Sequence, residues 1–367
     1  MTDQIELQRQ IALTLIPGLG PRKARKILEH FGTSEAFFHA EKKALIQVFG
    51  LGQQFVRQID RKTALRQAKT HVSDVLQQGL QTYFLQDETY PKYLRECADA
   101  PILLFGKGAL PINNYKAISI VGTRSATAYG LELCEELISN FTGKNILVVS
   151  GLAYGIDIHV HRLCLKYDVP TIGVMGNGPD RVYPAIHRKV AKDMLKQGGI
   201  LTEFLPGTKP EKENFPMRNR IVAGISQATI VIESKTKGGS LITATLANDY
   251  NRDVFAFPGQ VHQPYSEGCN WLIQQNKAHL IRNAQDFFRF MDWPMENASD
   301  MQLDLFKGLA PDERSIIKCF LNSLEQNFEG LVRHSGLKLP ELSSALLRLE
   351  IRGLIRALPG QKYLLRC

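Results

Sequence analysis

Residues 118–124 read Ile-Ser-Ile-Val-Gly-Thr-Arg, and residues 146–157 read Ile-Leu-Val-Val-Ser-Gly-Leu-Ala-Tyr-Gly-Ile-Asp. The apolar, β-branched runs that open both stretches are typical of buried strands. Between them, residues 129–141 carry apolar side chains at helical spacing. A strand, a helix and a second strand predict a right-handed crossover and a parallel sheet. Gly122 and Gly151 then lie at the carboxyl ends of neighbouring strands, where open α/β sheets bind ligands.

The first of these glycine turns has the composition of an anion site. Gly122 lets the backbone approach a ligand closely because it has no Cβ. Amides at the start of the following helix favour negative charge, and Arg124 adds a guanidinium whose donors suit phosphate. Alternatively, the glycines only make tight turns and Arg124 is a solvated charge. Two adjacent turns beside an arginine favour anion binding.

Composition and charge narrow the class of protein. The chain has 367 residues, 44% of them hydrophobic, with a formal net charge of +9, which permits a polyanionic partner. The N-terminus is polar and no apolar run is long enough to span a bilayer, so we expect a cytoplasmic protein without membrane contact. The 6 cysteines are scattered and form no Cys-x-x-Cys pair, so we expect neither a metal site nor disulfides.

Three motifs, in residues 122–130, 150–157 and 215–220, together resemble the DprA family (DNA processing protein A, also called Smf). The resemblance is strong over residues 80–290 and looser outside them. It implies a Rossmann-like α/β domain with a mostly parallel sheet and no cofactor. Tyr154 stands where the family usually has a basic residue, which removes one DNA contact.

The flanking regions predict two smaller helical domains. An apolar-Gly-Leu-Gly pattern recurs at residues 16–20 and 48–52, typical of a tandem helix-hairpin-helix (SAM-like) domain over residues 1–75. The Rossmann-like domain spans 76–291 and a polar linker spans 292–308. Residues 309–367 predict three helices and a hairpin, a winged helix, in which residues 343–348 face a groove. Arg348 is the one cation of that face, so protein contact and duplex reading both stay open.

The DNA-binding site is expected along the glycine turns and the loop at residues 206–220. That loop mixes cations with an aromatic residue, as single-strand binding surfaces do. The family uses a basic residue and a phenylalanine three apart there, which Lys212 and Phe215 match. Predicted DNA-binding residues are Gly122, Thr123, Arg124, Gly151, Lys212, Phe215, Arg218, Lys237, Gly238, Gly239 and Ser240.

A second set of polar residues is predicted to support this site. Asp157 and His161 are four residues apart on one helix, which favours a buried hydrogen-bonded pair over a metal or catalytic site. Arg218 and Arg220 either contact DNA or pair with Glu203 and Asp180, and the structural interpretation is favoured for Arg220. The full structural set is Asp157, His161, Asp180, Glu203, Asn219 and Arg220.

An enzyme on the same fold is the rival hypothesis. Residues 238–243 are similar to the phosphate loop of nucleotide phosphoribohydrolases that resemble lysine decarboxylases. Those enzymes need a glutamate shortly after the threonine, where this chain has Ala244, Thr245, Leu246 and Ala247. Without that carboxylate no general acid–base pair forms there, so we expect a binding protein.

The DprA resemblance implies a function in natural transformation and homologous recombination. The protein would bind and protect single-stranded DNA and load a RecA-type recombinase, with interplay with single-strand binding protein. Trp271 and Leu272 are expected either in the core or in a self-association surface. The second alternative follows from the resemblance, because this region makes a homodimer in the family.

Overall fold

The structure is a computed structural model that describes residues 4–48, 50–110, 112–293, 309–320 and 325–365. The chain divides into two compact units, Met1–Phe290 and Met291–Cys367. The predicted linker at 292–308 falls almost entirely outside the described residues.

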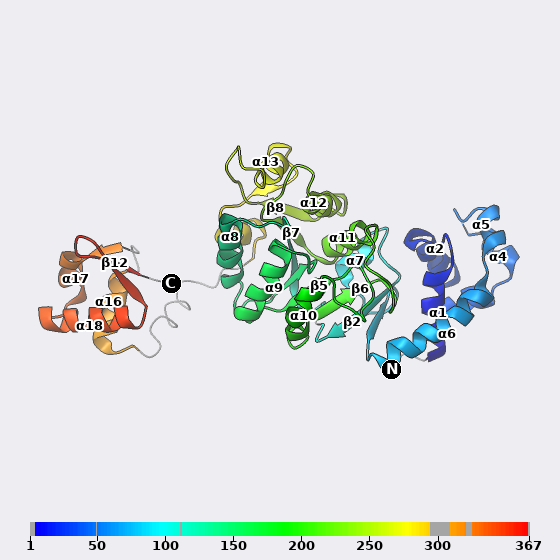
Figure 1. The fold of residues 1–367 in the computed structure, drawn as a ribbon, viewed down its shortest axis with the longest axis horizontal. Coiled ribbons are helices and arrows are strands. Elements are labelled where there is room, and N and C mark those ends of the chain that lie inside the picture. The colour runs from blue at the N-terminus through cyan, green and yellow to red at the C-terminus, as the bar shows by residue number, and fades with distance from the viewer. Residues whose placement is uncertain (1–3, 49, 111, 294–308, 321–324, 366–367) are drawn as a thin grey trace. The chain divides into compact units, whose positions relative to one another are not determined.

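A nine-stranded sheet is the framework of the first unit (Figure 1), with the order β1-β2-β6-β5-β4-β3-β7-β8-β9 among the described strands. Its strands are β1 (Gln81–Phe84), β2 (Leu103–Gly108), β3 (Lys116–Val121), β4 (Ile146–Ser150), β5 (Thr171–Val174), β6 (Gly199–Thr202), β7 (Ala228–Val231), β8 (Asp253–Ala256) and β9 (His279–Leu280). All neighbours from β6 to β9 pair in parallel, whereas β1 and β2 extend the sheet with antiparallel pairs.

The predicted strands at residues 118–121 and 146–149 are central in this sheet. Every residue of β4 is buried, as expected of a strand covered on both faces. Ile118 pairs with Val148 on one side and with Ala228 on the other. The predicted α/β fold is therefore confirmed.

Strand order reverses at the middle of the sheet. From β3 the chain steps outward through β4, β5 and β6, and then returns to place β7 on the other side of β3. The carboxyl ends of β3 and β7 thus flank the topological switch point, where open α/β sheets form a ligand crevice.

Helices cover both faces of the sheet, because crossovers in opposite directions leave right-handed connections on opposite faces. Helices α8, α9 and α10 pack in sequence, while α11 packs against α12 and α7 (Figure 1). The bounds are α7 (Lys92–Glu96), α8 (Ala128–Ser139), α9 (Ile156–Lys166), η1 (Ala185–His187), α10 (Arg188–Met194), α11 (Asn214–Ile225), α12 (Gly239–Asp249), α13 (Glu267–Gln274) and α14 (Ala284–Phe290).

The N-terminal residues form helices around the two predicted hairpins. These helices are α1 (Gln4–Leu15), α2 (Pro21–Phe31), α3 (Ser34–His39), α4 (Lys42–Ile46), α5 (Gln53–Gln58) and α6 (Arg61–Gln77). Gly18 and Gly52 have φ angles of 74° and 73°, which L-residues with a side chain rarely adopt. Some of the basic residues predicted near this domain are held internally. Arg25 donates to the main-chain oxygens of Arg95 and Cys97 at 2.6 and 3.0 Å.

The second unit is a winged helix with a hydrophobic core of its own. Its elements are α16 (Pro311–Cys319), β10 (Glu325–Asn327), α17 (Phe328–Ser335), α18 (Leu339–Ile351), β11 (Ile355–Leu358) and β12 (Lys362–Leu365). The described strands form a three-stranded sheet in the order β10-β12-β11. The predicted third helix at 340–350 corresponds to α18.

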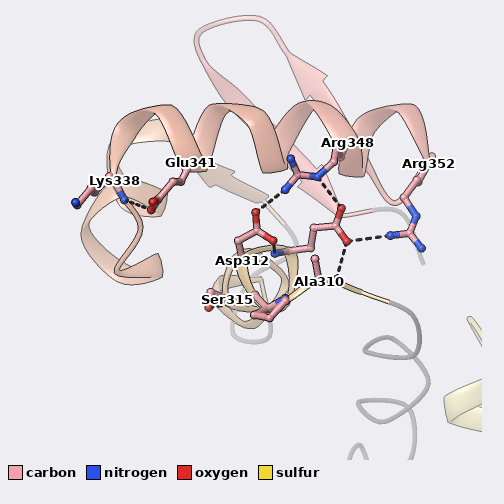
Figure 2. Close-up of polar contacts among 9 residues, drawn as sticks. Ala310, Asp312, Ser315, Lys338, Glu341, Arg348 and Arg352 are labelled. Carbon is pink, nitrogen blue, oxygen red and sulfur yellow. Dashed lines mark hydrogen bonds and ion pairs between the residues drawn. The ribbon is translucent and has the colours of Figure 1, made fainter.

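The cation of that third helix is bound within its own unit. Figure 2 shows Arg348 reaching from α18 to the start of α16, where it pairs with Asp312 and, at 3.2 Å, with Glu313. Arg352 contacts the same buried Glu313 at 2.9 Å. On α18, Leu347 and Ile351 are exposed instead. The exposed surface of the helix thus combines apolar side chains with an arginine that is paired with two carboxylates of α16.

Candidate nucleic-acid interface

A cleft of about 820 Å³ opens at the switch point, along the carboxyl edge of the sheet. Its walls are the turn after β3, the turn after β4, the start of α11 and the segment from the end of β7 into α12. All of the predicted DNA-binding residues line it: Gly122, Thr123, Arg124, Gly151, Lys212, Phe215, Arg218, Lys237, Gly238, Gly239 and Ser240. Residues far apart in the chain are thus brought to one site.

The start of α8 is not free to bind a ligand, because Glu233 already occupies it. Glu233 follows β7, is 2% exposed, and accepts hydrogen bonds from the amide and the hydroxyl of Thr127 at 3.0 and 2.5 Å. A carboxylate is the group that a helix N-terminus favours. Gly130 makes this approach possible, since a Cβ there would lie 2.2 Å from Glu233 Oε2. The anion at this terminus is therefore part of the protein.

The carboxylate of Asp157 likewise binds the main-chain amides of the second glycine turn. It accepts hydrogen bonds from the amides of Gly151 and Ala153 at 3.1 and 3.4 Å. The amide of Ile156 donates to Thr123 O at 3.1 Å. Burial raises the pKa of Asp157, while nearby Arg218 and these amides oppose the rise. Both turns shape the cleft, but their amides are largely used within the protein.

The start of α12 has no side-chain cap and faces the cleft. Gly238 precedes the helix without a side-chain cap, and Gly239 is exposed. The hydroxyl of Ser240 donates to Ser234 Oγ at 2.7 Å, which ties the turn to the end of β7. Exposed Lys235 and Lys237 lie beside it. The unpartnered positive end of a helix dipole and two cations make this side of the cleft suited to phosphate.

Arg218 lies beneath the cleft rather than on its surface. It is 4% exposed, donates to Val174 O at 3.0 Å, and interacts electrostatically with Asp157. Its guanidinium fills the space next to Gly151, where a Cβ would be only 1.7 Å from Nη1. A cation in this position supports the two turns from below. Of the two alternatives from the sequence, the geometry favours the structural one, although with Asp157 as its charged neighbour.

Arg124 and Phe215 come together across the cleft. The guanidinium carbon of Arg124 lies 5.9 Å from the centre of the Phe215 ring. The ring packs against the third glycine turn, since a Cβ on Gly176 would be 3.2 Å from it. Arg124 and Lys212 are both exposed. Sites that bind single-stranded nucleic acid combine cations, which hold phosphates, with an aromatic ring, on which a base stacks.

The predicted supporting residues have mixed outcomes. Arg220 forms a buried ion pair with Glu203, as expected, and also donates to Asp99 O. Asp180 does not pair with Arg218 or Arg220, because its carboxylate accepts from Gly207 N at 2.7 Å and from Arg181 at 3.1 Å. That pairing prediction was therefore wrong for Asp180.

Asn219 contributes to the same wall of the cleft. It lines the cleft, and its side-chain amide donates to Gly239 O at the start of α12, at the long distance of 3.5 Å. This contact joins α11 to α12.

The predicted Asp157–His161 hydrogen bond is absent from the described contacts of these residues. Both side chains are buried, but Nδ1 of His161 pairs with the hydroxyl of Thr171 on β5, at 2.7 Å. The two residues do share one face of the helix. However, Asp157 binds amides of the turn after β4, and His161 binds a residue of β5. Burial lowers the pKa of His161 to about 3, which keeps the imidazole neutral.

The predicted self-association pair is divided between core and surface. Leu272 is fully buried and belongs to the core of the first unit, so it is not a surface contact. Trp271 is 36% exposed, and the ammonium of Lys277 lies 4.8 Å from the centre of its ring.

Some cleft residues were not singled out from the sequence. Tyr183 is 47% exposed and its ring lies 5.9 Å from that of Phe215. Its position after a glycine turn was a signal that could have been used. Ser234 and Lys235 also line the cleft, which they reach through the switch-point topology.

Within the described ranges, no group of three or more histidine, cysteine, aspartate or glutamate side chains is arranged to hold a metal ion. No described helix combines the length and apolar character needed to cross a membrane. The described cysteines are free thiols, and Cys367 lies outside the described residues.

Fold and cleft together define a Rossmann-like protein that carries a helix-hairpin-helix module and a winged-helix module. The family model of DNA recombination-mediator protein A matches residues 81–292. Models of a SAM-like helix-hairpin-helix tandem and of the DprA winged helix domain match residues 11–66 and 307–361. The chain belongs to the DprA/Smf family, as the motifs indicated.

Individual relatives agree with this assignment. Protein Smf of Synechocystis is 30% identical over 96% of this chain and 97% of its own length. DNA processing protein DprA of Bacillus subtilis is 42% identical over 58% of this chain and 71% of its own length. The crystal structure of DprA from Streptococcus pneumoniae has a TM-score of 0.67 and 30% identity, covering 80% of this chain and 99% of that one.

A further solved structure carries a description of its ligand. DprA from Helicobacter pylori has a TM-score of 0.53 and 28% identity, covering 59% of this chain and 97% of that one. It is described as having a unique single-stranded DNA binding mode.

We expect Gly151→Ala to lower the free energy of unfolding of the first unit by about 1–3 kcal/mol, the usual cost of overpacking a core. The added Cβ would displace the Arg218 guanidinium. Urea unfolding measures the change. Gly239→Ala is the matched control, because nothing lies within 4 Å of a Cβ there. Equal losses in both variants would contradict the proposed packing.

His161 predicts a pH dependence of stability. Its pKa falls from 6.5 to about 3 on folding, so the unfolded chain takes up the proton first as the pH drops. Above pH 6.5 the imidazole is neutral in both states and the free energy of unfolding is unaffected. Below pH 6.5 the free energy of unfolding falls by up to ~1.4 kcal/mol per pH unit as the pH falls towards 3. We expect His161→Gln to show a shallower decline in urea unfolding below pH 6.5 than the wild type.

The exposed His262→Gln variant is the control and should follow the wild type. Since Asp157 is common to all three proteins, its contribution, which has the opposite sign, cancels in the comparison. Parallel curves for wild type and His161→Gln would refute the assignment.

Proposed function

We propose that this protein binds single-stranded DNA in the cleft at the carboxyl edge of its sheet. The proposal rests on the position of Arg124. Its guanidinium carbon lies 5.9 Å from the centre of the Phe215 ring, and both residues line the cleft. A cation beside a half-buried aromatic ring suits a phosphate with its neighbouring base, and bases offer a free face only when they are unpaired.

Each part of the cleft has a distinct role in this proposal. Arg124 and Lys212 neutralise phosphates from two walls, and the open start of α12 with Lys237 binds a further phosphate. Phe215 stacks a base. Gly122 and Gly151 leave room for the buried Ile156 and Arg218 side chains to pack against the two turns, and Arg218 supports those turns from below.

The family supports the same conclusion. The relatives are named DNA processing proteins, and the Helicobacter pylori relative is described by its single-stranded DNA binding. This chain matches the recombination-mediator model over the domain that contains the cleft.

The proposal is for a binding protein rather than an enzyme. Among the described residues that line the cleft, Asp157 is the single carboxylate, and it is buried and bound to main-chain amides. The phosphoribohydrolase alternative needs a glutamate after Thr243, and residues 244–247 offer none. A general acid or base requires a titratable group within reach of the substrate.

The finer proposals concern what happens to the bound strand. We propose that the protein acts in the cytoplasm during transformation, shields the strand from nucleases and transfers it to a RecA-type recombinase on DNA coated by single-strand binding protein. We also propose a homodimer that uses the exposed Trp271, without the buried Leu272.

We expect tight binding to a labelled single-stranded oligonucleotide, weaker binding to the matched duplex, and a steep loss of affinity with salt. Fluorescence anisotropy over a salt series measures all three. Loss of one phosphate contact should reduce the slope of log K against log salt by about 0.7. Arg124→Ala and Lys212→Ala should each show this reduction. Phe215→Ala should cost about 1–3 kcal/mol of binding without changing the slope.

Lys144→Ala is the matched control for charge, because Lys144 precedes β4 and so lies at the opposite edge of the sheet. Its affinity and slope should stay close to those of the wild type. The proposed function fails if the wild type does not bind near physiological salt, or if Lys144→Ala weakens binding as much as Arg124→Ala does.

Strand transfer predicts that the protein accelerates assembly of a RecA-type recombinase on an oligonucleotide coated with single-strand binding protein. Arg124→Ala should lose the acceleration, because it no longer holds the strand. Assembly is followed by the fluorescence of a labelled strand. Nuclease digestion of the same complexes measures protection of the strand. Sedimentation of the wild type and of Trp271→Ala measures self-association. Unchanged assembly rates with the wild-type protein present would refute the transfer role.

A further inference from the structure

A second cavity lies at the same edge of the sheet, on the other side of the end of β7. Its volume is about 670 Å³. The start of α8, Glu233 and residues 258–266 after β8 form its walls. None of its residues belongs to the predicted DNA-binding set.

This cavity directly adjoins the cleft, because the same two segments serve both. Thr123 and Arg124 line the cleft and Thr127 lines the cavity, while Glu233 lines the cavity and Lys235 lines the cleft. Three residues from Arg124 to Thr127 span at most about 11 Å. A strand whose phosphates are held at Arg124 is therefore within reach of the cavity.

The walls of the cavity suit a nucleobase. Tyr129 and Tyr265 contribute aromatic rings, and Gln260 and Gln263 contribute exposed side-chain amides. Side-chain amides both donate and accept hydrogen bonds, as base edges do, and tyrosine rings stack on bases. The described lining contains no lysine or arginine, and Glu233 adds negative charge. This combination disfavours phosphate and favours a flat, uncharged ligand with polar edges.

The loop that forms the outer wall is held in place. The amide of Ser234 donates to Tyr265 O at 2.7 Å, and the side chain of Asn270 bonds both N and O of Gly259, at 3.1 and 3.0 Å. The hydroxyl of Tyr129 donates to Pro258 O at 2.7 Å, joining α8 to the loop. Such ties keep the cavity open before a ligand arrives, which lowers the entropic cost of binding.

We propose that this cavity takes an unstacked nucleobase of the strand whose phosphates lie in the cleft. The inference rests on the proposed function and extends it with a second site for the same strand. Tyr265 provides the stacking surface, and Lys235, whose ammonium lies 4.8 Å from the centre of that ring, also lines the cleft. Gln263 contacts the edge of the base.

The test compares two labelled oligonucleotides of equal length, one of deoxyadenosines and one of abasic sugar-phosphates, by fluorescence anisotropy. Tyr265→Ala should weaken binding to the deoxyadenosine strand roughly tenfold, within the range for loss of one stacked base. Its affinity for the abasic strand should match that of the wild type. Tyr265→Phe keeps the ring and should bind both strands as the wild type does.

Gln263→Ala provides a second variant that leaves the fold intact, since its side chain is exposed. It should also weaken binding to the deoxyadenosine strand alone. The inference is overturned if neither variant changes that affinity while Arg124→Ala does, or if Tyr265→Ala weakens binding to both strands equally. If the wild type binds neither strand, the proposed function itself fails, and this inference with it.

Discussion

The cleft depends on two opposite charges buried directly beneath it. Asp157 binds the amides of the turn after β4, and Arg218 reaches from α11 to the end of β5 under the same turn. Removing either partner would leave an uncompensated charge inside the protein, which costs far more than the pair contributes. The glycine at position 151 leaves room for the guanidinium, because no side chain fills the space between it and the turn. The exposed cations are then held over a rigid floor.

Carboxylates of the protein itself decide where an external anion can bind. Glu233 binds at the start of α8, and Asp157 binds the amides of the turn before α9. The start of α12 has no side-chain cap and lines the cleft together with Arg124 and Lys212. Helix N-termini in general attract negative charge. A carboxylate of the protein that is already bound at one terminus therefore keeps an external anion away from it. This occupation also explains why a site with three glycine turns presents its cations mainly on two walls.

Local patterns in the sequence were sufficient for the sheet, the glycine turns and the residues that meet in the cleft. Apolar runs and their spacing locate strands and helices, and the carboxyl ends of parallel strands converge by geometry. They were insufficient wherever a partner comes from a distant element. His161 bonds Thr171 rather than Asp157, Asp180 bonds the Gly207 amide, and Leu272 is in the core. Occupation of the start of α8 depends on Glu233, which no spacing rule connects to Thr127.

The contact between Gly130 and Glu233 constrains how this sequence can change over time. A side chain at 130 would strike the carboxylate, and a shorter residue at 233 would leave Thr127 and the start of α8 without their partner. Neither position can therefore be altered without a loss. Positions linked in this way are frozen by epistasis. Lys212 and Lys237 are exposed, so no packed neighbour constrains their side chains in this way.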